Sequence, residues 1–223
     1  MRLSYFSYGI DIFIEENVVN VLVVENQNVY RELINDLILQ SAGNEGVWQL
    51  SDGDKDLIIA KSISLVHTPF MLELNSKKNL SYLYKELKFI SDEYAYEEMS
   101  EINTSIVAFL DKIAQKLPYQ LDYNFDLELP QLFKQYDVHI DMDGTSLLEK
   151  VLNYIQLEKT LCNAKLLVFI NLRSYFNDEE IVEIYKMASY NKISLFLVEI
   201  QKRDSISGEK YCIIDKDKCI ITY

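Results

Sequence analysis

Five consecutive apolar residues, Leu166 to Ile170, stand between a lysine and an asparagine. A run of this length is too short for a typical helix and indicates a strand that is buried on both faces of a parallel sheet. A helix is predicted next, because Asn177 is a good N-cap and three acidic residues follow it directly. A second apolar run, Ile193 to Val198, comes after that helix. Strand, crossover helix and strand form a βαβ unit, so the sequence predicts an α/β protein with a mostly parallel sheet.

Residues 1–63 are predicted to form the first part of this α/β head. Val18 to Glu25 is a strongly β-branched strand, and Asn26 can cap a helix whose apolar residues recur at helical spacing. Beyond that helix, the acidic turn Asp52 to Asp56 contains a glycine and predicts a β-hairpin. Residues 121–223 are predicted to form the second part of the head. In this part Val138–Met142 is predicted to be a strand, Ser146–Glu149 has the form of a capping box at a helix start, and the chain ends in another hairpin.

Residues 64–120 differ in character and are predicted to be a helical leg inserted into the head. From Leu74 to Leu117 there is neither glycine nor proline, and apolar residues recur at spacings of three and four. The register breaks near residues 92–100. The pattern predicts a helical hairpin or one long bent helix. It is equally the pattern of a simple packing element without a binding role.

The overall charge restricts the possible partners. The chain of 223 residues carries a formal net charge of -13, which disfavours a generic nucleic-acid binder because affinity for DNA depends on neutralising phosphates. No segment approaches the roughly 20 apolar residues of a membrane span, and early acidic residues interrupt any signal-peptide pattern. Three cysteines at unrelated spacings indicate reduced thiols in a cytoplasmic protein without membrane association.

Catalytic motifs are not found in the sequence. None of the six glycines has the spacing of a phosphate-binding P-loop. No Gly-x-Ser-x-Gly nucleophile elbow is present either. His67 and His139 are far apart and have no second metal ligand at helical spacing. We therefore expect no enzymatic activity, and a degenerate NTPase or nuclease is the least favoured hypothesis.

An acidic segment is the best candidate for a metal site. Residues 121–129 alternate between apolar and polar, so an extended conformation would place the polar side chains on one face. These side chains are Asp122, Asn124, Asp126 and Glu128. Calcium takes roughly six to eight oxygen ligands, and this face could supply part of that shell. The alternative is an exposed edge strand with solvated carboxylates.

Four lysines form a local basic strip at the start of the predicted leg. They are Lys77, Lys78, Lys85 and Lys88, and on a helix Lys78, Lys85 and, one turn on, Lys88 sit close to one face. Such a strip is either a solvated helix face or a contact for an anionic partner such as DNA.

Several segments are similar, in order and spacing, to those of one known family. They are Val21–Glu25, Leu74–Lys77, Leu80–Leu87, Leu147–Lys150, Lys165–Asn171, Asp178–Ile181 and Leu195–Glu199. Together they span nearly the whole chain. The sequence thereby resembles the small ring-forming accessory protein of type II-A CRISPR spacer acquisition.

The resemblance implies a head with P-loop-NTPase-like topology, without Walker motifs or nucleotide chemistry, and a helical leg. It implies a homotetrameric ring, stabilised by Ca²⁺, whose basic lumen receives double-stranded DNA ends. The implied partners are the CRISPR integrase complex and the RNA-guided nuclease. By position, Asp122, Asp126 and Glu128 inherit the role of metal ligands. The DNA-binding lysines do not transfer in this way, and Lys77, Lys78, Lys85 and Lys88 are our own choice.

Two functions are expected from these observations. The first is a non-catalytic, double-stranded DNA-end-binding ring protein that acts in CRISPR spacer acquisition. A ring that is acidic outside and locally basic inside would reconcile that function with the net charge of -13. The alternative is an acidic protein-interaction scaffold of the adaptation complex with little DNA affinity of its own.

Overall fold

The computed structural model describes residues 1–142, 144–162 and 164–222. The chain divides into two compact units: a head unit of Met1–Leu74 and Met142–Tyr223, and a leg unit of Asn75–Asp141. The leg unit thus begins and ends later than the predicted range 64–120. It begins later because residues 64–66 belong to a strand that pairs within the head sheet. It ends later because a short helix at residues 129–135 packs against the first leg helix.

The head unit is built on a six-stranded sheet with the strand order β10-β9-β3-β8-β7-β6. Its strands are β3 (Val19–Val24), β6 (Ile63–Val66), β7 (Leu166–Ile170), β8 (Ser194–Glu199), β9 (Glu209–Ile214) and β10 (Ile220–Thr222). All neighbouring strands are parallel except β10, which pairs with β9 as an antiparallel hairpin. Every residue of β7 is buried, which confirms the prediction of a two-sided, buried strand. The closing hairpin is confirmed as well.

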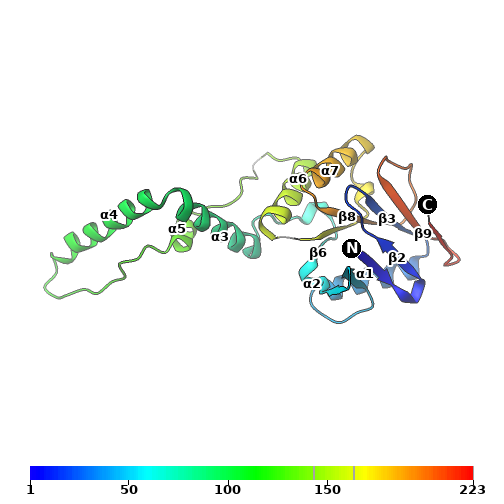
Figure 1. Cartoon of the computed structure of the whole chain (residues 1–223). Coiled ribbons are helices and arrows are strands. Elements are labelled where there is room, and N and C mark those ends of the chain that lie inside the picture. Colours follow the sequence, from blue (N-terminus) through cyan, green and yellow to red (C-terminus); the bar gives the residue numbers. More distant parts are fainter. Residues whose placement is uncertain (143, 163, 223) are drawn as a thin grey trace. The chain divides into compact units, whose positions relative to one another are not determined.

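Helices cover both faces of this sheet (Figure 1). On one face, α1 (Gln27–Ser41) packs its buried residues Val29, Leu33 and Leu37 against the sheet. On the other face, α6 (Leu147–Leu157) and α7 (Asp178–Tyr190) lie side by side. The caps predicted from the sequence are confirmed. The side chain of Asn26 caps α1, and capping boxes begin α6 at Ser146 and α7 at Asn177.

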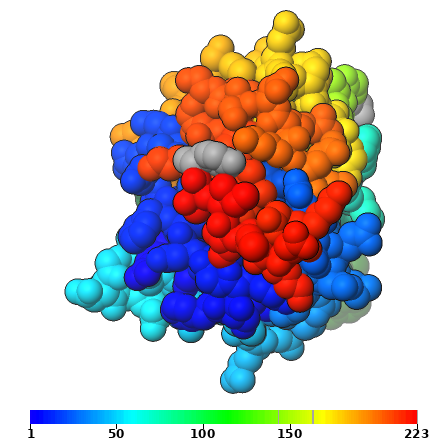
Figure 2. Space-filling view, turned by 90° about the vertical axis from the view of Figure 1, so that its right-hand side faces the viewer, coloured from blue at the N-terminus to red at the C-terminus, as the bar shows by residue number. Residues whose placement is uncertain are grey.

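A second, antiparallel sheet lies in the head unit, with the order β2-β1-β4-β5. Its strands are β1 (Arg2–Tyr5), β2 (Ile10–Phe13), β4 (Gln49–Asp52) and β5 (Lys55–Leu57). β4 and β5 are the hairpin predicted around residues 52–56. Trp48 lies between the rings of Tyr5 and Phe196 and thereby connects this sheet to the larger one. Figure 2 shows the C-terminal hairpin beside the N-terminal strands on one face of the head.

Short helical turns complete the head unit. They are α2 (Ile59–Ser62), the 3-10 turns Phe6–Tyr8, Pro69–Met71 and Leu172–Ser174, and a π-helical turn at Glu158–Cys162.

The leg unit consists of α3 (Lys77–Tyr94), α4 (Tyr96–Ala114) and α5 (Leu129–Gln135). Only Ala95 separates α3 from α4, and α4 runs onward instead of folding back (Figure 1). Of the two predicted arrangements, the bent helix is therefore the one observed. Among the residues that the structure describes, no helix has both the length and the apolar character to cross a membrane.

The strands predicted at residues 121–129 and 138–142 are wrong. The structure describes both segments as coil, apart from the start of α5. Alternating polarity has the period of a strand, but a strand also needs a neighbour with which to exchange backbone hydrogen bonds. Both segments instead bond to helix side chains. Asn103 donates to the carbonyl of Phe125 over 2.9 Å, and Tyr84 donates to the carbonyl of Val138 over 3.0 Å.

Candidate functional site

The four predicted DNA-binding lysines lie together on the exposed face of α3. Lys77, Lys78, Lys85 and Lys88 fall within about 100° of one another around an ideal helix, and all four are exposed. Tyr84, which borders this face on an ideal helix, is buried inside the leg unit with its ring 5.8 Å from that of Phe133. The lysine face is therefore exposed at its lysines and bordered on one side by packing within the leg.

The charges of these lysines are not compensated by nearby carboxylates. Among the described residues, none of the ion pairs within 4.0 Å involves any of the four. The ammonium of Lys85 lies 5.6 Å from the ring centre of Tyr82. Lys77 and Lys78 occupy the first turn of α3, which has no acidic residue. A helix N-terminus and two free ammonium groups together form a region that attracts anions.

The predicted metal ligands lie on an exposed coil beside α4. The segment is attached through Phe125 to Asn103, and the hydroxyl of Tyr123 donates to the carboxylate of Asp111. Asn124 does not share an outward face with its neighbours, because its side-chain oxygen accepts the backbone N–H of Asp126 over 3.1 Å. The chain bends there, and the flat acidic face predicted for an extended strand does not form.

Asp122, Asp126 and Glu128 are all exposed, and Glu128 is the residue that precedes α5. Within the described ranges, no group of three or more His, Cys, Asp or Glu residues comes close enough to hold a metal ion. Calcium needs roughly six to eight oxygen ligands. In the described structure these three carboxylates are therefore not gathered into one cluster.

β3 leads directly into α1, and a strand followed by a helix is the setting in which a phosphate-binding loop can occur. Here only Glu25 and Asn26 join the two elements. The Asn26 side chain accepts the N–H groups of Asn28 and Val29, over 3.1 and 3.2 Å. A P-loop needs a longer, glycine-rich loop whose free N–H groups bind phosphate. In this chain the two-residue connection is too short for such a loop. The backbone N–H groups of Asn28 and Val29 already donate to the side chain of Asn26.

A buried charge network at Arg173 was not predicted from the sequence. The Arg173 guanidinium donates to Glu209, to the hydroxyl of Tyr211 and to the carbonyl of Asp204. Glu209 also accepts the hydroxyl of Tyr185 and the backbone N–H of Ile206. The network fixes the segment between β8 and β9. A single arginine in a 3-10 turn carries no local signal of burial, so sequence reasoning had no means of finding it.

Glu199, at the end of β8, lies beside this network. Its carboxylate accepts the backbone N–H of Arg173 over 3.0 Å, and the side chain is buried. Burial disfavours the charged form and raises the pKa of Glu199 to about 7.

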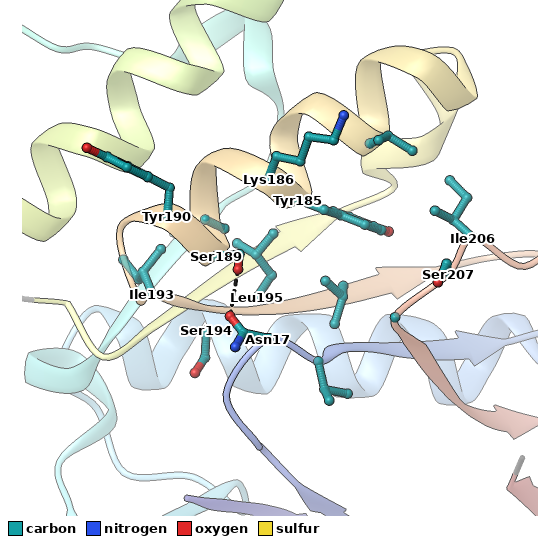
Figure 3. Close-up of a pocket in the computed structure, with 15 residues that line it drawn as sticks. Asn17, Tyr185, Lys186, Ser189, Tyr190, Ile193, Ser194, Leu195, Ile206 and Ser207 are labelled. Carbon is teal, nitrogen blue, oxygen red and sulfur yellow. Dashed lines mark hydrogen bonds between the residues drawn. The ribbon is translucent and has the colours of Figure 1, made fainter.

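A cavity of about 530 Å³ opens between α7 and the amino ends of β3 and β8. Figure 3 shows Tyr185 pointing from α7 toward Ile206 and Ser207, and the hydroxyl of Ser189 facing Asn17. The Ser189 hydroxyl donates to the side chain of Asn17 over 2.6 Å. This cavity was also missed by sequence reasoning, because its walls come from four separate segments.

The sequence matches one family model over residues 40–218, a range that includes the leg unit and most of the head unit. The family is described as CRISPR-associated protein (Cas_Csn2). The chain belongs to this family. The resemblance recognised in the sequence is thereby confirmed, and with it a CRISPR-associated role for this Csn2-family chain. No curated protein matches the sequence.

Solved structures show which other proteins resemble this Csn2-family chain in fold. One is an ATP-binding cassette of an ABC transporter in its ADP conformation, with a TM-score of 0.50 and 16% identity. The match covers 99% of this chain and 88% of that chain. The likeness concerns the fold alone. An ATP-binding ABC transporter protein from Pyrococcus furiosus matches with a TM-score of 0.39 and 11% identity, over 91% of this chain and 88% of that one.

Proposed function

We propose that the protein binds double-stranded DNA ends, without catalysis, during CRISPR spacer acquisition. The observation that carries the proposal is the exposed, uncompensated lysine face of α3 in a chain of this CRISPR-associated family. In a protein of net charge -13, four clustered lysines separate positive charge from the acidic remainder. Charge segregation of this kind is what a DNA contact requires on an acidic chain.

The position of Lys77 and Lys78 supports a binding role for this face. Both lie in the first turn of α3, where the helix dipole disfavours cations by a few tenths of a kcal/mol to about 1 kcal/mol. Acidic residues would stabilise this helix start better. A phosphate bound at the N-terminus of α3 would offset this unfavourable interaction between the lysines and the helix dipole. The phosphate interacts favourably with the N–H groups and with both ammonium groups.

The proposed assembly is a homotetrameric ring, and α4 provides a surface for contacts between copies. No residue of α4 is buried. Its apolar stripe remains in solvent and consists of Ile102, Ile106, Phe109 and Ile113. These residues recur at spacings of four, three and four, which is the spacing of helix-to-helix contacts. A second copy would remove this stripe from water.

The calcium part of the proposal rests on the family resemblance. Because Asp122, Asp126 and Glu128 do not form a ligand shell within one chain, we place the ion between copies, with further oxygens from a neighbouring subunit. Calorimetric titration of the tetramer with Ca²⁺ should then show binding that the Asp122→Asn/Asp126→Asn variant loses. Binding that this variant retains would move the site elsewhere.

A nucleotide has no part in the proposed function. We infer that the head shares the P-loop-NTPase-like topology of ATP-binding cassettes, with the phosphate-binding loop replaced by the two-residue connection from β3 to α1. Cys212 and Cys219 are free thiols, in keeping with our proposal of a cytoplasmic protein.

The deciding experiment compares linear and covalently closed circular DNA of one sequence, each with calcium and with a chelator. A ring that loads over ends binds linear DNA only, and only with calcium. Equal binding to both DNAs would show a surface contact and would exclude threading. Binding to neither DNA would leave the scaffold function.

The acidic scaffold is the second candidate, and the net charge of -13 favours it. As a scaffold, the protein would bind the CRISPR integrase complex and the RNA-guided nuclease without using its lysine face. A variant with Lys77, Lys78, Lys85 and Lys88 changed to glutamate should then retain these complexes. Loss of both complexes in that variant would contradict the scaffold.

A further inference from the structure

The cavity beside α7 has the composition of a small-molecule site. Its volume of about 530 Å³ lies in the range of about 300–1,000 Å³ that is typical of ligand pockets. Its lining is largely apolar: Val18, Val182 and Ile206 are partly exposed there, whereas Val19, Ala188 and Leu195 are buried. Apolar walls around an open space lack packing partners, so an apolar group that enters gains contacts.

The walls of the cavity are held in place by polar contacts around it. The backbone N–H of Val19 donates to the carbonyl of Gly208 over 2.9 Å, and Ser189 bonds to Asn17. Glu209 accepts both the N–H of Ile206, over 2.7 Å, and the hydroxyl of Tyr185, over 2.6 Å. These bonds tie the segment before β9 to α7 and to β3. The cavity is therefore preformed, and a ligand would not need to order it.

The charge of the lining is opposite to that of the protein. Among the described residues that line the cavity, none is acidic, although the chain contains 35 acidic residues and 22 basic ones. The one charged residue in the lining is Lys186, which is exposed and takes part in none of the ion pairs within 4.0 Å found in the described ranges. The lining also contains the hydroxyl groups of Ser189, Tyr190 and Ser207, which lie at separate places around the cavity (Figure 3).

We infer that this cavity binds a small amphipathic anion, an apolar ring or chain that carries one carboxylate. The apolar part lies against Val18, Val182 and Ile206, and the carboxylate pairs with the ammonium of Lys186 at the rim. This site is separate from the α3 lysine face and does not depend on DNA binding.

The test uses naphthalene-2-carboxylate and its uncharged counterpart, naphthalene-2-carboxamide, titrated into the full-length protein by calorimetry. Wild type should bind the carboxylate about two- to fivefold more tightly than the amide, the preference that an exposed ion pair provides. Lys186→Glu should remove that preference while the amide still binds. Lys216→Glu, on an exposed lysine outside the cavity lining, is the charge-matched control and should behave as wild type.

Two occluding variants locate the site. Val182→Trp fills the cavity from α7 and Ser207→Trp fills it from the opposite wall, so each should weaken binding of both ligands more than tenfold. Ser207 is exposed, so this variant tests the site even if Val182→Trp fails to fold. No binding to wild type at millimolar ligand would overturn the inference. Binding unchanged in Ser207→Trp would overturn it too, since the ligand would then bind outside this cavity. An equal affinity of wild type for the carboxylate and the amide would overturn the inference that the ligand is an anion.

Discussion

Arg173 and Glu209 form an ion pair at 3.4 Å in which the arginine side chain is 2% exposed and the glutamate is fully buried. The two residues lie on different elements, one directly after β7 and the other at the start of β9. Their neighbours complete the hydrogen bonding of both groups, except that the Nε of Arg173 has no partner among the described residues. A buried pair of this kind contributes little net stability, but breaking it leaves an uncompensated buried charge.

Replacing Arg173 by methionine should lower the free energy of unfolding by about 3–5 kcal/mol, because Glu209 would remain buried without its cation. Urea denaturation measures the change. The double variant Arg173→Met/Glu209→Met should recover part of the loss.

Asp178→Asn is the control for that experiment. Asp178 also bonds to Arg173, over 3.1 Å, but its side chain is 70% exposed. We expect this variant to cost about 1 kcal/mol or less. If Arg173→Met cost no more than Asp178→Asn, the buried pair would not be a structural constraint.

The pKa of Glu199, raised from 4.5 to about 7 by burial, predicts a pH dependence of stability. The native state holds the Glu199 proton more tightly than the unfolded state does, so this group destabilises the fold progressively as the pH rises from 4.5 to 7. The full effect is about 3 kcal/mol. Glu199→Gln keeps the acceptor for the Arg173 N–H but cannot ionise.

Glu199→Gln and wild type should therefore be about equally stable near pH 4.5, and the variant should be more stable by about 3 kcal/mol at pH 8. Thermal or urea unfolding across this range checks the difference. Glu183→Gln, on the exposed side of α7, should follow the wild-type profile. A constant difference between Glu199→Gln and wild type at all pH values would contradict the shifted pKa.

The lysine face predicts a specific loss of DNA affinity. Lys78→Glu/Lys85→Glu should weaken binding to linear duplex DNA at least about tenfold and should reduce the slope of log affinity against log salt by about one per lost phosphate contact. Filter binding or fluorescence anisotropy at several salt concentrations measures both.

The charge-matched control is Lys112→Glu/Lys116→Glu, which changes two exposed lysines elsewhere in the leg unit. It should affect binding much less and should retain the salt slope. Equal losses in both double variants would mean that net charge alone, and not the α3 face, determines the affinity.

The apolar stripe of α4 predicts which changes break the assembly. Ile106→Glu/Phe109→Glu would place two carboxylates in the proposed contact between copies, so the tetramer should dissociate in size-exclusion chromatography with light scattering. Ser100→Glu/Thr104→Glu adds the same charge on the opposite side of the helix and should remain tetrameric. A wild-type monomer with and without calcium would contradict the assembly altogether.

Local sequence patterns were sufficient for most of the head. The strand at Leu166–Ile170, the caps at Asn26 and Asn177 and the hairpin around residues 52–56 all depend on neighbours within a few positions. These short-range preferences were therefore visible before any tertiary contact was known. The family was visible as well, because it rests on the order and spacing of such segments.

The acidic segment at 121–129 shows where local patterns fail. Its alternation is that of a strand, yet no strand edge accompanies it in the leg unit, and Asn103 and Asp111 on α4 hold it instead. The flat acidic face expected of a strand therefore does not form in this segment. The lysine face, by contrast, was predictable because α3 is a regular helix with its apolar side packed within the leg.

By itself, the sequence determined the α/β class, the helix caps, the basic face of α3 and the family, because each is encoded in residues close together along the chain. Only the tertiary structure decided the burial of Arg173 with Glu209, the raised pKa of Glu199, the extent of the leg unit and the cavity beside α7. These features join residues that are far apart in sequence, and burial and desolvation arise only when the fold brings such residues together.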